Sequence, residues 1–307
     1  MFERAGNAFY LGWMSKNIAP FVGNSNFVNE IKSLLPTLSS NNASVLLVGE
    51  RGSGKRLIAQ HIHYEAAKNF GYFFEVNCRA FSEFQILESF DTVEKLASYN
   101  QRVTLFISFI DELNAPQQEK LLSLIKDFSK KKLDFKLISS TEAALDSKVA
   151  DGKFSSELYY RLNAVVLNVI PLRQRKEDIL PIAQNCLESF RKKSGYGFTQ
   201  FSDSAISAME SNFWGGNVDE LFNAIQRAFI VGKPPLIKAE DLGFSGIEVD
   251  LQDKSLKNAL DTFKKQYLTR ILEENGWNQT KTAQILGIQR TYVIRLINEL
   301  QIRRNKD

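Results

Sequence analysis

Val45–His63, with the sequence VLLVGERGSGKRLIAQHIH, is the stretch that decides the fold of this chain. It opens on an apolar run that predicts a buried strand, and a helix is expected from about Lys55 to Ala67. Between the two, Gly49–Lys55 fits the pattern G-x-x-x-x-G-K. Glycines let backbone N–H groups wrap around phosphate oxygens, and the start of the following helix favours an anion. The stretch therefore predicts a phosphate-binding loop.

The expected ligand of this loop is a nucleotide, ATP or ADP. Lys55 would reach its outer phosphates. Arg56 stands where a Ser or Thr usually ligates Mg²⁺, so a bound Mg²⁺ has only weak support. The residues predicted to bind the cofactor are Gly49, Glu50, Arg51, Gly52, Ser53, Gly54, Lys55 and Arg56.

Strands and helices alternate outward from the loop as far as Pro171. Further strands are expected at 73–76, 103–110, 133–139 and 165–170, with helices at 26–38 and 114–128. This alternation predicts a parallel sheet covered by helices on both faces. After Pro171 only helices are expected, at 179–194, 202–212 and 217–231.

Composition excludes several classes of protein. No run of about 18 apolar residues exists, so we expect no membrane span, and the N-terminus lacks the apolar core of a signal peptide. Cys78 and Cys186 lie far apart in apolar segments. We therefore expect buried free thiols in a reducing cytoplasm, and no metal site.

The C-terminal segment carries the positive charge of the chain. Residues 255–307 hold ten Lys and Arg against five Asp and Glu, a net charge of +5. The other residues hold 29 against 30, a net charge of −1. A basic excess confined to one end is the electrostatic footprint of a nucleic-acid contact.

Three helices are expected in this basic segment. The first has an apolar face made by Leu256, Leu260, Phe263, Tyr267 and Ile271. A short helix at 279–286, a turn at Gly287 and a helix at 290–300 then predict a helix-turn-helix. The last helix would enter the major groove, and the start of the middle helix would contact phosphates. The predicted DNA-binding residues are Asn278, Gln279, Thr280, Lys281, Gln289, Arg290, Thr291, Tyr292, Arg295 and Asn298.

Several motifs resemble one bacterial family. With the phosphate loop, the motifs FFEVNC (73–78), ELYYRLN (157–163), PLRQRKEDI (171–179) and FWGGNVDEL (213–221) resemble the AAA+ domain of NtrC-like sigma-54-dependent activators, the enhancer-binding proteins. The segment NQTKTAQILGIQRTYVIRLINELQI (278–302) resembles the Fis-type helix-turn-helix that closes these activators. The resemblance covers about residues 21–302.

The resemblance implies an α/β fold class, an AAA+ P-loop parallel sheet with a helical lid subdomain, followed by an all-α helix-turn-helix domain. We expect an N-terminal arm over residues 1–20, the α/β subdomain over 21–171 and the lid over 172–245. A linker over 246–254 and the DNA-binding domain over 255–307 complete the chain.

The family has a pair of acidic residues at the end of its third strand, and this sequence can be aligned with that pair in two ways. Ending the strand at Ile110 makes Asp111 and Glu112 the pair that holds Mg²⁺ and polarises water. Aligning the flanking motifs TLF and EKLL without gaps puts Ser108 and Phe109 there instead. We favour the second register because it keeps both flanks intact. Asp111 and Glu112 then remain only weak catalytic candidates.

Other positions of this sequence depart from the family pattern whichever of the two alignments is used. Glu142 replaces an Asn after the fourth strand. Ser155 replaces one arginine finger, although the second survives as Arg161, a further weak catalytic candidate. Asp219 replaces the arginine of the lid that contacts the nucleotide, and its negative charge would repel phosphate. We therefore expect weak nucleotide binding or none, and no hydrolysis.

The GAFTGA loop, with which the family contacts sigma-54, is also missing from Asn77–Val103. We therefore predict a cytoplasmic, sequence-specific DNA-binding transcription regulator with a hydrolysis-deficient AAA+ module. Its expected partners are double-stranded DNA, a second copy through the C-terminal domain, and either sigma-54 polymerase or a related activator. Two alternatives stay open, an ATP-hydrolysing sigma-54-dependent activator and a structural or chaperone-like AAA+ oligomer.

Overall fold

The structure is a computed structural model and describes residues 10–11, 18–67, 71–80, 83–98, 102–131, 133, 135–194 and 200–243. Near the C-terminus it describes 264–265, 268–269, 271–272, 275, 277–286, 288–300 and 302. The chain divides into two compact units, Met1–Leu242 and Gly243–Asp307, and each is treated by itself. The predicted linker 246–254, most of the arm, and Leu256, Leu260, Phe263, Tyr267 and Gly287 lie outside the described residues.

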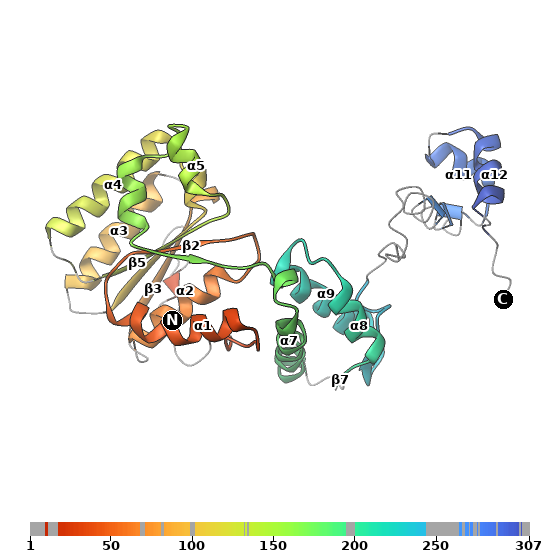
Figure 1. Ribbon diagram of the computed structural model, residues 1–307, viewed down its shortest axis with the longest axis horizontal. Coiled ribbons are helices and arrows are strands. Elements are labelled where there is room, and N and C mark those ends of the chain that lie inside the picture. The colour runs from red at the N-terminus through yellow and green to blue at the C-terminus, as the bar shows by residue number, and fades with distance from the viewer. Residues whose placement is uncertain are drawn as a thin grey trace. The chain divides into compact units, whose positions relative to one another are not determined.

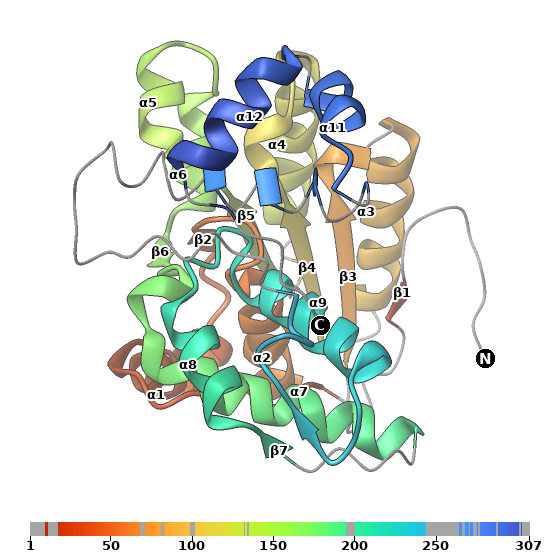
Figure 2. The same cartoon turned by 90° about the vertical axis from the view of Figure 1, so that its right-hand side faces the viewer.

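A six-stranded sheet in the order β1-β3-β4-β5-β2-β6 forms the centre of the first unit (Figure 1). Every neighbouring pair is parallel except β1 with β3, which confirms the predicted parallel sheet. Figure 2 shows β3, β4 and β5 side by side. The strands are β1 (Tyr10–Leu11), β2 (Val45–Val48), β3 (Tyr72–Asn77), β4 (Val103–Ser108), β5 (Phe135–Thr141) and β6 (Val165–Asn168).

Helices cover both faces of this sheet because its strands are apolar on both sides. One core joins the sheet to α1 (Asn26–Ser40) and α2 (Lys55–Ala67) through residues such as Ile31, Ile58 and Phe106. The other core joins it to α3 (Glu83–Ser98), α4 (Ala115–Lys130), α5 (Leu145–Ala150) and α6 (Ser156–Leu162). Asn114 caps α4, as predicted: its side chain accepts from the N–H of Gln117 at 3.0 Å.

A helical lid follows the sheet. It begins with two 3-10 turns, Leu172–Gln174 and Lys176–Asp178, and contains α7 (Ile179–Ser194), α8 (Asp203–Ser211) and α9 (Asn217–Val231). The short parallel pair β7 (Gln200–Phe201) and β8 (Leu236–Ile237) closes it. Trp214 is completely buried, and its indole N–H donates to the carbonyl of Met209 at 2.7 Å.

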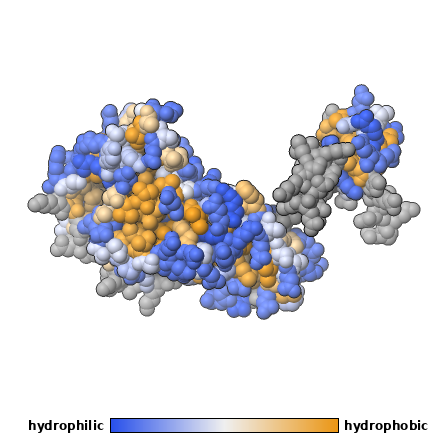
Figure 3. Space-filling model, viewed as in Figure 1, coloured by the Kyte–Doolittle hydropathy of each residue, from blue (hydrophilic) through white to orange (hydrophobic). Residues whose placement is uncertain are grey.

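In the second unit, the described helices are α11 (Gln279–Leu286) and α12 (Arg290–Glu299). Both pack on a small core of Leu268, Leu272, Ala283, Val293 and Ile302. Hydrophilic residues cover much of the surface seen in Figure 3. None of the helices that the structure describes has the length and apolarity needed to cross a membrane.

The structure differs from the sequence expectation in several elements of the first unit. Strands β7 and β8 lie in the lid, where only helices were expected, and helices α5 and α6 were not expected. The strand expected over 103–110 ends at Ser108, because Phe109 adopts a left-handed conformation with φ of 58° that a strand cannot continue. Within the segment expected to be an arm, Tyr10–Leu11 pairs with β3. Helix α3 was not expected either.

His63 on α2 generates a prediction about acid stability. It is 1% exposed and shares a hydrogen bond of 2.8 Å with Thr104 on β4. Burial, with a smaller contribution from the charge of Arg102, lowers the pKa of His63 from 6.5 to about 4. The unfolded chain therefore takes up this proton at a higher pH than the folded chain does, so stability falls as the pH drops from 6.5 towards 4.

We expect this residue to contribute about 3 kcal/mol to that loss. Urea unfolding of the wild type and of His63→Gln, measured between about pH 7.5 and about pH 4, checks it. The variant should lose distinctly less stability than the wild type over this range. Equal losses would show that His63 titrates alike in both states.

Candidate functional site

The phosphate loop has the backbone that its glycines predict. Gly52 and Gly54 have φ angles of 72° and 101°, which favour glycine. A Cβ atom on Gly52 would lie 2.2 Å from the carbonyl oxygen of Gly216 in the lid. Val218 at the start of α9 donates its N–H to the Gly52 carbonyl at 3.0 Å. Gly52 is thus required both by its conformation and by the closeness of the lid.

Lys55 is held inside the loop. It is 9% exposed, and its Nζ donates to the carbonyls of Gly49 and Glu50 at 2.6 and 2.7 Å. Burial lowers the pKa of Lys55, and the nearby charges of Glu142 and Asp111 act in the opposite direction. The hydroxyl of Ser53 is also buried in the loop and has no hydrogen-bond partner among the described residues. The loop therefore contains a cation and a free polar group that phosphate could engage.

The loop is joined to the lid by charged and polar contacts. Arg173 donates to both carboxylate oxygens of Glu50, at 2.7 and 2.5 Å. Asn217 donates to Glu50 at 3.2 Å and to the carbonyl of Arg51 at 2.9 Å. The hydrogen bonds from Arg173 and then Asn217 lower the pKa of Glu50 to about 2. Glu50 is therefore a link between subdomains rather than a free acid.

Arg175 adds a second link between the lid and the loop. It is 3% exposed and donates to the carbonyl of Ser53 at 2.6 Å. The motif PLRQRKEDI was identified from the sequence by its family resemblance, but no role was predicted for Arg173 or Arg175. Two arginines in a motif directly after the last strand of the sheet were the only sequence signal for this contact. Their partners lie more than 120 residues earlier in the chain, so the sequence did not reveal them.

Arg56, predicted to touch the cofactor, turns towards the sheet instead. Its Nε donates to Glu75 on β3 at 2.6 Å, and 54% of its side chain is exposed. Of the other predicted residues, Gly49–Gly54 connect β2 to α2, and Lys55 is the first residue of α2.

At the end of β4, the position directly after the strand is occupied by Phe109. Ser108 is the last residue of the strand, and its hydroxyl donates to the carbonyl of Val76 at 3.3 Å. Asp111 and Glu112 lie one turn later, in the 3-10 turn Ile110–Glu112. This places no carboxylate at the strand end itself.

The two acids of this turn already have cationic partners. Lys148 lies 3.6 Å from the Asp111 carboxylate and donates to its backbone carbonyl at 2.7 Å. Arg79, just after β3, donates to Glu112 at 3.2 Å and to Glu142 at 2.8 Å. Asp111 Oδ1 and Glu142 Oε1 are buried and accept no hydrogen bond in the described structure.

The residues present do not fit the Mg²⁺ that a P-loop implies. The residue after Lys55 is an arginine paired with Glu75, and the strand end offers Ser108 and Phe109. The acids near Lys55 already have Arg79 and Lys148 as counter-ions. Among the side chains that the structure describes, no group of three or more His, Cys, Asp or Glu is arranged to hold a metal ion.

Three other positions singled out from the sequence have local partners. Ser155 caps α6, accepting from the N–H of Leu158 at 3.3 Å. Arg161 lies 3.7 Å from Glu157 on the same helix. Asp219, in the first turn of α9, has its Cβ 3.2 Å from the Cβ position that a side chain on Gly52 would take. A negative charge thus sits beside the phosphate loop.

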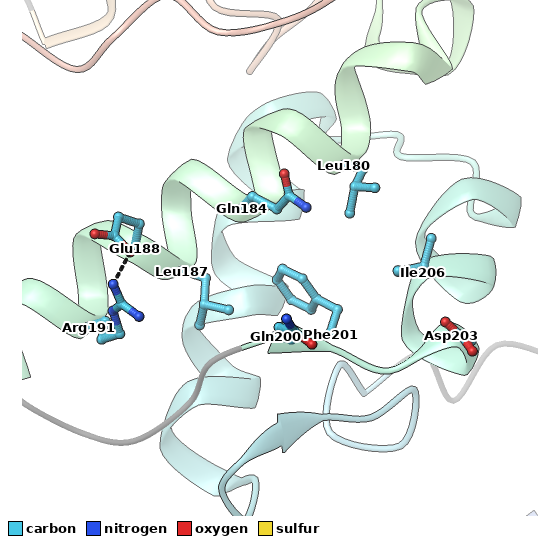
Figure 4. A pocket seen from close by; sticks show the side chains of 9 residues that line it. All are labelled: Leu180, Gln184, Leu187, Glu188, Arg191, Gln200, Phe201, Asp203 and Ile206. Carbon is cyan, nitrogen blue, oxygen red and sulfur yellow. Dashed lines mark ion pairs between the residues drawn. The ribbon is translucent and has the colours of Figure 1, made fainter.

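A separate cavity of about 460 Å³ lies within the lid (Figure 4). Figure 4 shows Leu180, Leu187, Phe201 and Ile206 around it, with the ion pair between Glu188 and Arg191 at one end. No residue of the phosphate loop lines this cavity. It is therefore distinct from the phosphate loop.

In the second unit, the predicted DNA-binding residues lie on accessible parts of α11 and α12. All ten are exposed except Gln279, which is half-buried. Arg295 lies over the ring of Tyr292, with its guanidinium carbon 4.7 Å from the ring centre. Asn278 caps α11, accepting from the N–H groups of Thr280 and Lys281 at 3.1 Å each.

Comparison with protein families matches nearly the whole chain. Residues 22–172 match the Sigma-54 interaction domain, residues 173–258 the AAA+ ATPase lid domain, and residues 259–295 the bacterial regulatory protein Fis family. These matches follow the same order as the sheet, the lid and the helices of the second unit.

Known relatives and solved structures agree with these matches. The chain is 30% identical over 297 residues to the Sigma54-dependent transcriptional activator SfnR of Pseudomonas putida, covering 83% of this chain and 81% of that protein. It is 31% identical to the regulatory protein AtoC of Escherichia coli K12, over 86% of this chain but only 64% of AtoC. The chain also matches the Nif-specific regulatory protein of Azotobacter vinelandii and covers 59% of the length of that protein.

The fold is similar to that of NtrX from Brucella abortus, solved in complex with ADP. The TM-score is 0.64 at 22% identity, with 93% of this chain and 70% of that chain covered. The branch migration motor RuvB of Thermotoga maritima has a TM-score of 0.54 at 18% identity, covering 92% of this chain and 91% of that chain. With its sheet, lid, helix-turn-helix and relatives, this chain belongs to the family of sigma-54-dependent transcription regulators.

Proposed function

We propose that this chain is a sequence-specific DNA-binding regulator whose AAA+ module binds ATP or ADP but does not hydrolyse ATP. The observation that carries the proposal is the pairing of every described acid near the end of β4 with a cation. Asp111 pairs with Lys148, and Glu112 and Glu142 pair with Arg79. Hydrolysis needs a carboxylate free to position water and a cation held against the phosphates.

Nucleotide binding is supported by the loop itself. Lys55, the unpartnered hydroxyl of Ser53 and the start of α2 converge on the loop between β2 and α2. NtrX from Brucella abortus, which has a similar fold, was solved with ADP and with ATP. We place the nucleotide on Gly49–Lys55 and exclude Arg56, which is committed to Glu75.

The second unit supplies the DNA contact in this proposal. Its exposed donors on α12 suit base edges in the major groove, and those at the start of α11 suit phosphates. A homodimer through this unit would read a near-palindromic site. The protein would act in the cytoplasm, where bacterial DNA is, and its further partner would be sigma-54 polymerase or a related activator.

A working ATPase is the second candidate. It is favoured by the closeness of Glu142 and Asp111 to Lys55, since their charges influence the pKa of this lysine. In that case the two acids would act from displaced positions.

Phosphate release separates the two candidates. We expect the purified wild type to release phosphate from ATP no faster than Lys55→Ala, because the acids at the strand ends are paired with Lys148 and Arg79. Asp111→Asn and Glu112→Gln should leave this background unchanged. Turnover that Lys55→Ala abolishes, and that either acid variant reduces, would establish the ATPase instead.

The DNA contact makes a separate prediction. If Arg295 contacts a guanine, Arg295→Ala should weaken binding to the specific site by about 1–3 kcal/mol and relax the preference for that base. Lys281→Ala, which removes a charge at the start of α11, should instead weaken binding to all sequences alike. Competition binding against a library of sites at fixed salt measures both effects. An unchanged site preference in Arg295→Ala would exclude this role.

A further inference from the structure

We propose that Arg79 takes the place of a divalent cation at the nucleotide site, so that the protein binds nucleoside phosphates without Mg²⁺. This inference rests on the nucleotide binding proposed above and specifies its chemistry. It starts from the acids near Lys55 and from the guanidinium of Arg79, which joins one of them, Glu142, to Glu112.

The topology of the sheet brings Arg79 to the ends of three strands. Arg79 follows β3, and β3 pairs with β4 so that Asn77 lies opposite Ser108. Glu142 follows β5, the next strand beyond β4. The carboxyl ends of parallel strands meet at one edge of a sheet, which is where α/β proteins bind their ligands. Arg79 therefore lies at the ligand-binding edge.

The guanidinium bridges two carboxylates there. One nitrogen of Arg79 lies 3.2 Å from Glu112 Oε1 and 2.8 Å from Glu142 Oε2, so these oxygens are at most 6.0 Å apart. The guanidinium carbon lies 4.0 Å from the centre of the Phe109 ring. The ring and the two acids together hold the guanidinium beside the carboxyl ends of β3, β4 and β5.

Electrostatics explains why a cation is needed at this place. Glu142 and Asp111 are close enough to Lys55 to affect its pKa. Unpaired, these acids would repel the outer phosphates of a nucleotide. A divalent cation usually cancels such charge, and here Arg79 offsets the charge of Glu142 while Lys148 offsets that of Asp111. The side chain of Arg79 is 37% exposed, so it retains an accessible face for phosphate oxygens.

Removal of the arginine would leave two unpaired carboxylates, Glu112 and Glu142, which could hold a divalent cation together with the phosphates of a nucleotide. Glu142 Oε1 and Asp111 Oδ1 are buried without a hydrogen bond in the described structure, and loss of Arg79 would release Glu112 and a second oxygen of Glu142. Carboxylate oxygens are the ligands that Mg²⁺ and Mn²⁺ prefer. Removing the arginine should thus convert metal-independent binding into metal-dependent binding.

The test is calorimetric titration of the full chain with ATP and ADP, in Mg²⁺ and in EDTA. Wild-type affinities in the two buffers should agree within about two-fold, whereas Arg79→Ala should bind about ten-fold more weakly in EDTA and recover when Mg²⁺ is added. Arg79→Lys, which keeps the charge, should stay independent of metal. Arg191→Ala, which breaks a lid ion pair of the same 2.8 Å length, is the matched control and should behave as the wild type.

A second measurement needs no nucleotide. Titration with Mn²⁺, followed by electron paramagnetic resonance, should detect a site in Arg79→Ala that is absent from the wild type and from Arg79→Ala combined with Glu142→Gln. Wild-type nucleotide binding that collapses in EDTA would overturn the role of Arg79 while leaving nucleotide binding intact. Failure of the wild type to bind nucleotide in either buffer would instead overturn the proposed nucleotide binding, and this inference with it.

Discussion

The contact between Gly52 and the first turn of α9 is the constraint on which the rest of the site depends. No other residue fits there, because a Cβ would collide with the Gly216 carbonyl. The Val218 N–H fixes the distance, and the pairing of Glu50 with Arg173 fixes the direction of approach. Since the loop and the lid share these bonds, the shape of the phosphate loop and the position of the lid are set together.

Charge around Lys55 decides what this arrangement can do chemically. The three acids at the strand ends have Arg79 and Lys148 as partners, and two of them, Asp111 and Glu142, lie near Lys55, so these cations together offset their negative charge. A balanced site suits the binding of an anion better than the activation of water, which needs an uncommitted carboxylate. In the second unit, exposed Arg295 lies over the ring of Tyr292, and no ion pair of Arg295 is found among the described residues.

Local patterns were sufficient to predict most elements of the fold. The apolar runs predicted β2 through β6, and the glycine-rich pattern predicted the turn between β2 and α2. The capping residue Asn114 and the helices α7, α9 and α11 were also found where the periodicity placed them. These features were accessible because each is encoded by residues close together in the chain, through apolar spacing or turn chemistry.

Only the tertiary structure decided which charged residues pair with each other and where the short strands form and end. Arg79 meets Glu142 across 63 positions, and Arg173 meets Glu50 across 123, distances that only the strand order closes. The two-residue strand β1 exists through its pairing with β3, and β4 stops at Ser108 because of the backbone at Phe109. Spacing reveals which face a residue occupies, but the counter-ion of a side chain depends on which segments the folded sheet places beside it.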